Sequence, residues 1–306
     1  MRNMFAQVLY ELGCEDERIH IVVADISPAG PMAKFRERFP HRFINVGVAE
    51  QVMIGICAGL ALKGMRPFAY TIATFSLYRP FEMVRDDLCY QNLPVTIVGI
   101  GGGVIYSTLG GTHYAQEDIA IAGAIPNMSI IAPCDPEEAR SATHFVAKRE
   151  SGGPVYLRFG KAGEPVITAD AAEPFEFGRL RYLWKGDDVA VISYGVIMGM
   201  ARKVAERLRE QGRSTSLIAC HTLKPLDRAG IADVLRRHRR VIVIEEHAPQ
   251  GGLAPQAKQV AWDIGATCDL ATFTLKDEFV HCYGSHEDLL AKHGLSADSI
   301  MAHLDV

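Results

Sequence analysis

Short runs of apolar, β-favouring residues alternate with helical segments along this chain, and this alternation constrains its fold most strongly. The runs in the first half are residues 19–24 (IHIVVA), 95–100 (VTIVGI), 129–132 and 155–158. Helices are expected between them, at residues 50–63, 80–91, 116–124 and 136–148. A strand that is apolar at every position must be covered on both faces, and helices supply that cover. The sequence therefore predicts an α/β fold with mostly parallel sheets.

A second series of elements follows an irregular stretch. Residues 161–177 (KAGEPVITADAAEPFEF) show no clear period and indicate a linker or an exposed β excursion. Strands are then expected at residues 189–194, 214–219 and 241–245, with helices at 196–211, 227–237 and 253–264. A length of 306 residues also fits about two domains. We predict two doubly wound domains, residues 1–165 and 186–306, joined by a linker at 166–185.

Composition excludes several classes of protein. Lys and Arg number 32 against 36 Asp and Glu, so the basic excess typical of nucleic-acid binders is missing. The longest apolar stretches, 54–62 and 189–201, are shorter than the ~20 residues that span a bilayer. Residues 1–13 have the pattern of an amphipathic helix rather than of a signal peptide. Seven widely spaced cysteines without a CxxC pair indicate a reducing compartment, and we expect a cytoplasmic protein without membrane partners.

Two motifs suggest a ligand-binding site but lack the residue spacing that such a site requires. Residues 99–103 (GIGGG) follow a strand but do not fit the dinucleotide pattern G-x-G-x-x-G. His281, Cys282, His286 and His293 lie close in sequence, but their spacing matches no standard zinc site. We therefore predict no metal ligand in this chain.

Three other segments contain candidate catalytic or binding residues. Glu50 begins an almost wholly apolar helix that we expect to be buried, where a carboxylate is costly unless it is paired or functional. Residues 74–81 (TFSLYRPF) place three aromatic side chains within seven residues, which suits either a core or a stacking surface for a flat heterocycle. His113 follows a glycine turn and precedes a helix. It is placed either to reach into a cleft or to lie on the surface.

Taken together and in this order, these segments resemble the transketolase family of thiamine-diphosphate enzymes, over nearly the whole chain. The matching segments are ADIS (24–27), NVGVAEQ (45–51), TFSLYRPFEMVR (74–85), GGTHYAQEDIA (110–120), HTLKPLD (221–227) and EEH followed by GGL (245–253). The resemblance is to the C-terminal subunit of a split-gene transketolase. It implies a pyrimidine-binding domain followed by a transketolase C-terminal domain.

The resemblance also implies roles at the cofactor. Glu50 falls on the family's catalytic glutamate, which is hydrogen-bonded to the aminopyrimidine and drives its shift to the imino tautomer. Such a residue works best as the acid form in a dry site. Phe75 is the first choice for stacking on the pyrimidine. The further cofactor-binding candidates are Asp25, Tyr78, Arg79 and Phe81.

His113 is assigned by the resemblance to catalysis and to contact with the substrate or intermediate. Several expected substrate contacts are replaced: the family's acidic residue falls on Leu109, its histidine on Gly101, its serine on Ala29 and its arginine on Lys161. Loss of this set weakens the contacts to phosphate and hydroxyl groups. We expect Gly101, Leu109 and Lys161 to face a donor or acceptor that is smaller or less hydroxylated than the usual pentose and hexose phosphates.

The family's diphosphate-binding domain, marked by G-D-G and a later asparagine, is missing from this sequence. The nearest string, residues 186–188 (GDD), lies before a strand of the second half. We therefore expect an N-terminal transketolase subunit to supply that domain together with its Mg²⁺ or Ca²⁺, in an α2β2 heterotetramer. The implied function is thiamine-diphosphate-dependent transfer of a two-carbon ketol unit. This chain is then the half-enzyme that supplies the catalytic glutamate, and it is inactive alone.

Three other functions stay open. The chain could be the β subunit of a 2-oxoacid dehydrogenase, although residues 112–118 (THYAQED) and 221–227 look more like transketolase. It could belong to a deoxyxylulose-phosphate-synthase-like enzyme that uses pyruvate, although that enzyme is normally one long chain. It could also be a non-catalytic scaffolding subunit, against which the intact Glu50 argues.

Overall fold

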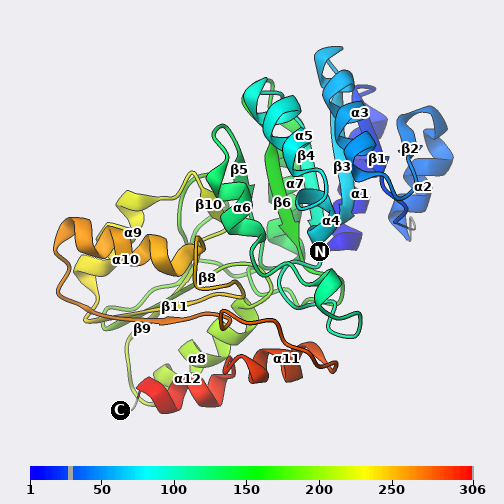
Figure 1. The fold of residues 1–306 in the computed structure, drawn as a ribbon. Helices are drawn as coiled ribbons and strands as arrows, with labels where there is room; N and C mark the ends of the chain where they lie inside the picture. The colour runs from blue at the N-terminus through cyan, green and yellow to red at the C-terminus, as the bar shows by residue number, and fades with distance from the viewer. Residues whose placement is uncertain (27–29, 305–306) are drawn as a thin grey trace.

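Two mostly parallel sheets organise the chain, as Figure 1 shows. The computed structural model describes residues 1–26 and 30–304. The first sheet has seven strands in the order β10-β5-β6-β4-β3-β1-β2. These strands are β1 (Ile19–Val23), β2 (Phe43–Asn45), β3 (Arg66–Ile72), β4 (Thr96–Ile100), β5 (Ser129–Ile131), β6 (Val155–Phe159) and β10 (Thr222–Lys224). The predicted α/β class is confirmed.

Helices cover both faces of the first sheet. One face carries α1 (Arg2–Glu15), α2 (Pro31–Arg38) and α7 (Pro136–Lys148), which share one buried cluster with the strands. The other face carries α3 (Glu50–Leu62), the π-helical segment η2 (Val84–Tyr90) and α6 (Asp118–Ala124). Three short helical pieces, α4 (Ala73–Leu77), α5 (Phe81–Met83) and η3 (Gly111–His113), connect these elements, and η1 (Pro40–Arg42) precedes β2.

The second sheet has five strands in the order β12-β11-β8-β9-β7. They are β7 (Arg181–Trp184), β8 (Val189–Ser193), β9 (Thr215–Ala219), β11 (Arg240–Ile244) and β12 (Asp269–Phe273). The helices around it are α8 (Met198–Glu210), α9 (Arg228–Arg237), α10 (Leu253–Ile264), α11 (His286–Lys292) and α12 (Ala297–Leu304). In Figure 1, α8, α11 and α12 lie on one side of this sheet, and α9 and α10 lie on the other.

Some elements differ from the sequence-based expectation. Strand β7 lies within the predicted linker 166–185, where it pairs antiparallel with β9 at the edge of the second sheet. Its residues alternate between buried and half-buried positions, which is a weaker signal than a continuous apolar run. The predicted helix 80–91 is divided into α5 and the π-helical η2. Strand β3, which begins with Arg66 and Pro67, was not predicted.

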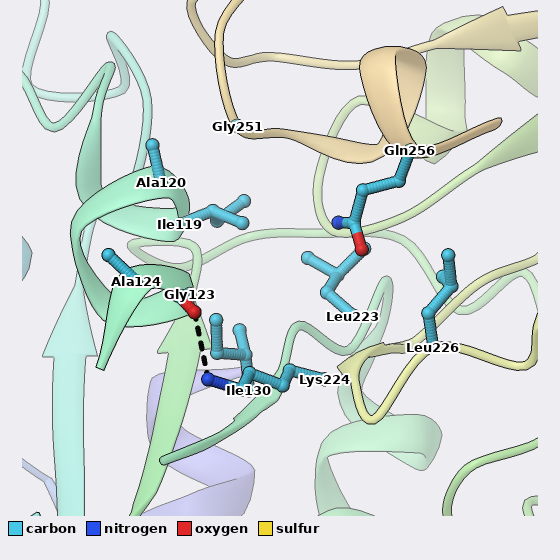
Figure 2. Close-up of a pocket in the computed structure, with 10 residues that line it drawn as sticks. All are labelled: Ile119, Ala120, Gly123, Ala124, Ile130, Leu223, Lys224, Leu226, Gly251 and Gln256. Carbon is cyan, nitrogen blue, oxygen red and sulfur yellow. Dashed lines mark hydrogen bonds between the residues drawn. The ribbon is translucent and has the colours of Figure 1, made fainter. Parts of the chain in front are cut away.

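The second half of the chain contributes a strand to the first sheet, so the two halves are in direct contact. Strand β10 comes from the second half but pairs antiparallel with β5 of the first sheet. Lys224 is the last residue of β10, and its Nζ atom donates hydrogen bonds to the carbonyl oxygens of Gly123 (2.8 Å) and Ile125 (2.6 Å) at the end of α6. Figure 2 shows this lysine at the wall of a cavity of about 410 Å³ between α6 and α10. One buried apolar cluster also extends from the first sheet to α9 and α10.

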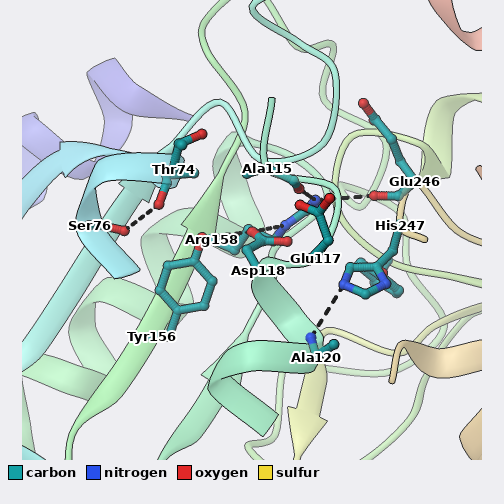
Figure 3. Close-up of polar contacts among 12 residues, drawn as sticks. Thr74, Ser76, Ala115, Glu117, Asp118, Ala120, Tyr156, Arg158, Glu246 and His247 are labelled. Atoms are coloured by element: carbon teal, nitrogen blue, oxygen red, sulfur yellow. Dashed lines mark hydrogen bonds and ion pairs between the residues drawn. The ribbon is translucent and has the colours of Figure 1, made fainter. Parts of the chain in front are cut away.

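A buried ion pair joins β6 to the start of α6 (Figure 3). Arg158 Nε donates to Asp118 Oδ2 at 2.7 Å, and the Tyr156 hydroxyl donates to the same oxygen at 2.7 Å. Arg158 Nη2 also donates to the carbonyl oxygen of Glu246 in the second half, at 3.1 Å. Burial disfavours the charge of Arg158, but the Asp118 carboxylate outweighs this and raises the pKa of the guanidinium.

Glycines 101–103 are explained by this packing rather than by a phosphate loop. A Cβ on Gly102 would collide with Arg158 Nε, and one on Gly103 would collide with Glu246 Oε1. Glu246 Oε1 accepts hydrogen bonds from the backbone N–H of Val104 at 2.7 Å and from His286 at 2.8 Å. The glycines therefore allow side chains of both halves to approach the backbone after β4.

We predict that Arg158→Met lowers the free energy of unfolding by about 3–5 kcal/mol, because it leaves the Asp118 carboxylate buried without its charged partner. Urea unfolding measures the change. Arg85→Met is the matched control, because Arg85 pairs with Glu82 on an exposed surface and should leave stability almost unchanged. Equal effects of the two substitutions would show that the buried pair does not stabilise the fold.

The pair between Glu246 and His286 predicts a pH dependence. Burial alone would lower the pKa of His286, but the Glu246 carboxylate outweighs it and raises the pKa above the ordinary 6.5. A raised pKa in the folded state means that the stabilisation is complete below pH 6.5 and is lost as the pH rises through the folded value. We expect the stability difference between wild type and His286→Asn to shrink from pH 6 to about pH 9. A difference independent of pH would contradict the pairing.

Candidate functional site

The candidate residues gather at the carboxyl ends of the parallel strands of the first sheet. Open α/β sheets bind ligands in the crevice at this edge. Phe75 lies on α4 directly after β3, Gly101 follows β4, and Lys161 follows β6. Glu50 begins α3 after the loop that leaves β2. These strands are neighbours in the sheet or one strand apart, so the topology brings segments distant in sequence to one edge.

Glu50 is a buried carboxylate that forms an ion pair with Arg79. Its side chain is 3% exposed and lies at the N-terminus of α3, where the helix dipole favours negative charge. Arg79 Nη1 donates to Glu50 Oε1 at 3.1 Å and to Oε2 at 3.2 Å. The structure therefore shows how the buried carboxylate is compensated, which the sequence left open.

An aromatic ring and a histidine complete the surroundings of this pair. The guanidinium carbon of Arg79 lies 4.2 Å from the ring centre of Phe75, a cation–π contact. The ring of His113 meets Phe75 nearly edge-on, with 5.2 Å between ring centres. Burial, followed by the charge of Arg79, lowers the pKa of His113. Both effects favour the neutral imidazole, and Thr112 Oγ1 lies 2.9 Å from its Nδ1.

Tyr106 belongs to this site and was missed from the sequence. A Cβ on Gly101 would overlap Cε2 of Tyr106, so the tyrosine ring fills the space that any side chain at position 101 would need. The ring is buried, lies 6.1 Å from that of His113, and has Lys161 Nζ 5.3 Å from its centre. A signal was present in the sequence, because an aromatic residue lies three positions after the glycine run 101–103.

Other candidates from the sequence lie elsewhere. The Tyr78 hydroxyl donates to Glu117 Oε2 at 2.9 Å, and Phe81 packs against the buried cluster of the first sheet. Asp25 lies two residues after the end of β1, and its backbone N–H donates to Asn45 Oδ1. Leu109 is an exposed residue of the loop before His113. Ala29 lies outside the described residues.

Helix α3 is buried on one side only, whereas its almost wholly apolar sequence led us to expect a buried helix. Met53, Ile54 and Cys57 face the core. On the opposite side Val52 and Leu62 are exposed, as is Val48 just before the helix. Apart from the backbone of the helix itself and the adjacent residues, no described atom lies within 4 Å of a Cβ built on Gly55 or Gly59. A helix that is apolar all round and exposed on one side is typical of a surface that another protein covers.

Residues 1–26 and 30–304 contain no group of three or more His, Cys, Asp or Glu side chains arranged to hold a metal ion. In the same ranges, no helix is both long enough and apolar enough to cross a membrane.

Comparisons with known proteins cover both halves. Residues 1–163 match the family model described as the pyrimidine binding domain of transketolase, and residues 178–300 match the model of the transketolase C-terminal domain. A putative transketolase C-terminal section from Methanocaldococcus jannaschii is 34% identical over 302 residues, covering 98% of this chain and 93% of that protein. A subunit of an apulose-4-phosphate transketolase from Phocaeicola vulgatus is 31% identical over 299 residues, covering 98% and 94%.

A solved structure described as a split gene transketolase, inactive beta4 tetramer, has the same fold. It superposes with a TM-score of 0.88 at 32% sequence identity, covering 99% of this chain and 96% of that chain.

The packing of Tyr106 on Gly101 gives a prediction. Gly101→Ala should lower the free energy of unfolding by about 2–5 kcal/mol, because it adds overpacking to an unfavourable positive φ. Gly163→Ala is the matched control: Gly163 has a φ of +86°, and no described atom lies within 4 Å of its Cβ position. The difference between the two variants in thermal unfolding isolates the clash. Equal losses would show that the Tyr106 ring moves aside freely.

Proposed function

Because the chain belongs to the transketolase family of thiamine-diphosphate-dependent enzymes, we propose that it is the half-enzyme supplying the catalytic glutamate for transfer of a two-carbon ketol unit. One observation carries this proposal. A buried carboxylate, Glu50, lies at the head of α3 beside the face of an aromatic ring, Phe75, at the ligand-binding edge of the sheet.

The residues present fit the ring half of thiamine diphosphate. The planar guanidinium of Arg79 lies against Phe75 while donating to Glu50, which shows that a flat group with an N–H donor is accommodated there. Phe75 would stack on the aminopyrimidine, and Glu50 would hydrogen-bond to its ring nitrogen. Asp25, Tyr78 and Phe81 stay secondary candidates for cofactor contact, whereas Arg79 contacts the two residues that would hold the ring, Glu50 and Phe75.

When bound, the cofactor supplies the electron sink for breaking and forming a carbon–carbon bond next to a carbonyl group. The residues of this chain would orient the cofactor and substrate and transfer protons. Glu50, whose side chain is 3% exposed, would hold and return the proton at the ring nitrogen of the cofactor. Burial and the charge of Arg79 lower the pKa of His113, and its neutral imidazole can donate or accept a hydrogen bond at the substrate oxygens.

The rest of the cofactor site requires a second subunit. The described residues offer no metal-binding cluster for a diphosphate-bound Mg²⁺ or Ca²⁺. The exposed apolar side of α3, which begins at Glu50, is the surface that we assign to an N-terminal transketolase subunit with the diphosphate-binding domain. The similar proteins support this division, because one is described as an inactive tetramer of a split gene transketolase and others are named as a transketolase subunit and a C-terminal section. We propose an α2β2 assembly.

The substrate end of the site is less polar than the family pattern. Gly101 offers no side chain, Leu109 replaces an acidic residue, and the buried ring of Tyr106 closes the space between His113 and Lys161. These features support a donor or acceptor that is smaller or less hydroxylated than pentose and hexose phosphates. The seven cysteines are all free thiols, which supports a reducing, cytoplasmic compartment.

Replacement of Glu50 tests the proposed function. In the complex with the diphosphate-binding subunit, Glu50→Gln should lower kcat/KM by a factor of about 10² to 10⁴, the usual range for loss of a general acid or base. The assay uses both ketose phosphates and pyruvate as donors, and sedimentation confirms that the complex still assembles. Glu82→Gln is the matched control, because Glu82 is an exposed carboxylate on α5.

Full activity of the Glu50→Gln complex would refute the catalytic role and favour a scaffolding subunit. Turnover by this chain alone with thiamine diphosphate and magnesium would refute the need for a partner.

A further inference from the structure

The position of Arg79 conflicts with the role proposed for Glu50. Among the described residues, Arg79 supplies the side-chain hydrogen bonds that both oxygens of Glu50 accept, at 3.1 and 3.2 Å. A carboxylate that contacts a ring nitrogen of the cofactor must have an oxygen available for it. The ion pair and the cofactor contact therefore compete for the same acceptor atoms.

The competition extends to the aromatic face. The guanidinium carbon of Arg79 lies 4.2 Å from the ring centre of Phe75, the distance of a stacked planar group. A flat ring that stacks on Phe75 and hydrogen-bonds to Glu50 would need this same space. The guanidinium is planar, carries N–H donors and stacks on aromatic faces, so it reproduces both contacts of an aminopyrimidine.

Arg79 can also leave this position. Its side chain is 44% exposed, whereas that of Glu50 is 3% exposed. It follows Tyr78, whose hydroxyl is bonded to Glu117, so the backbone on its N-terminal side stays anchored while the long side chain rotates into solvent. Until then, the pair compensates a carboxylate whose burial alone would be costly.

We propose that Arg79 holds the place of the pyrimidine ring before the cofactor binds and is displaced by that ring. Arg79 is thus a positioning residue that acts through Glu50 and not a ligand of the cofactor. The proposal rests on the proposed function, because it requires a pyrimidine ring between Phe75 and Glu50. It makes cofactor affinity depend on the energy needed to break the contacts of Arg79.

Arg79→Met tests the proposal in the complex with the diphosphate-binding subunit. Calorimetry compares the Kd of thiamine diphosphate with that of inorganic diphosphate, both with magnesium. We expect thiamine diphosphate to bind roughly tenfold tighter to the variant, because one ion pair and one cation–π contact no longer have to be broken. Inorganic diphosphate has no ring, so its Kd should not change. Arg85→Met is the matched control, since Arg85 pairs with Glu82 and Asp86 rather than with Glu50.

Weaker binding of thiamine diphosphate to Arg79→Met would overturn the proposal, because Arg79 would then be a cofactor ligand. Unchanged binding would overturn it as well. Failure of the wild-type complex to bind thiamine diphosphate at all would instead refute the proposed function.

A second measurement does not depend on the folding of the variant. In a crystal structure of the wild-type complex with thiamine diphosphate, we expect Arg79 to have left both the Glu50 carboxylate and the face of Phe75. Retention of the Arg79–Glu50 contacts beside the bound ring would overturn the proposal.

Discussion

The buried pair between Arg158 and Asp118 is the interaction on which the candidate site at the edge of the first sheet depends. It joins β6 to the start of α6, and the same guanidinium reaches the backbone of the second half at Glu246. A buried ion pair contributes less to net stability than its short distance suggests, but it tolerates few alternative arrangements. His113 and the glycines after β4 lie on loops that these contacts of Arg158 hold in place. The geometry of the candidate site therefore depends on the same contacts.

Much of the architecture follows from the sequence because local patterns determine it. Continuous apolar runs predicted β1, β4, β5, β6 and β8, and capping and charge patterns agree with α7 as observed. The motif-based resemblance to the transketolase family is confirmed by matches to both domain models. Strand β3 was missed because it opens with Arg66 and Pro67, and Arg66 is buried through ion pairs that only the fold provides.

The candidate site was less predictable because its contacts join distant residues. Glu50 could be selected from its place at the head of an apolar helix, but its partner Arg79 is 29 residues away and could not be identified by spacing. Tyr106 was overlooked because its effect arises only where its ring meets Gly101. Helix α3 was expected to be buried, but one of its sides is exposed, because a sequence shows that a face is apolar without showing what covers it.

The pairing of β10 with β5 has a consequence for how the protein is made. During synthesis the other strands of the first sheet are translated before residues 222–224 emerge, so its β5 edge stays open while about 60 more residues are added. An open strand edge is a template for pairing with other chains. The nascent first half therefore has a period of exposure to aggregation that ends only when the second half closes the sheet.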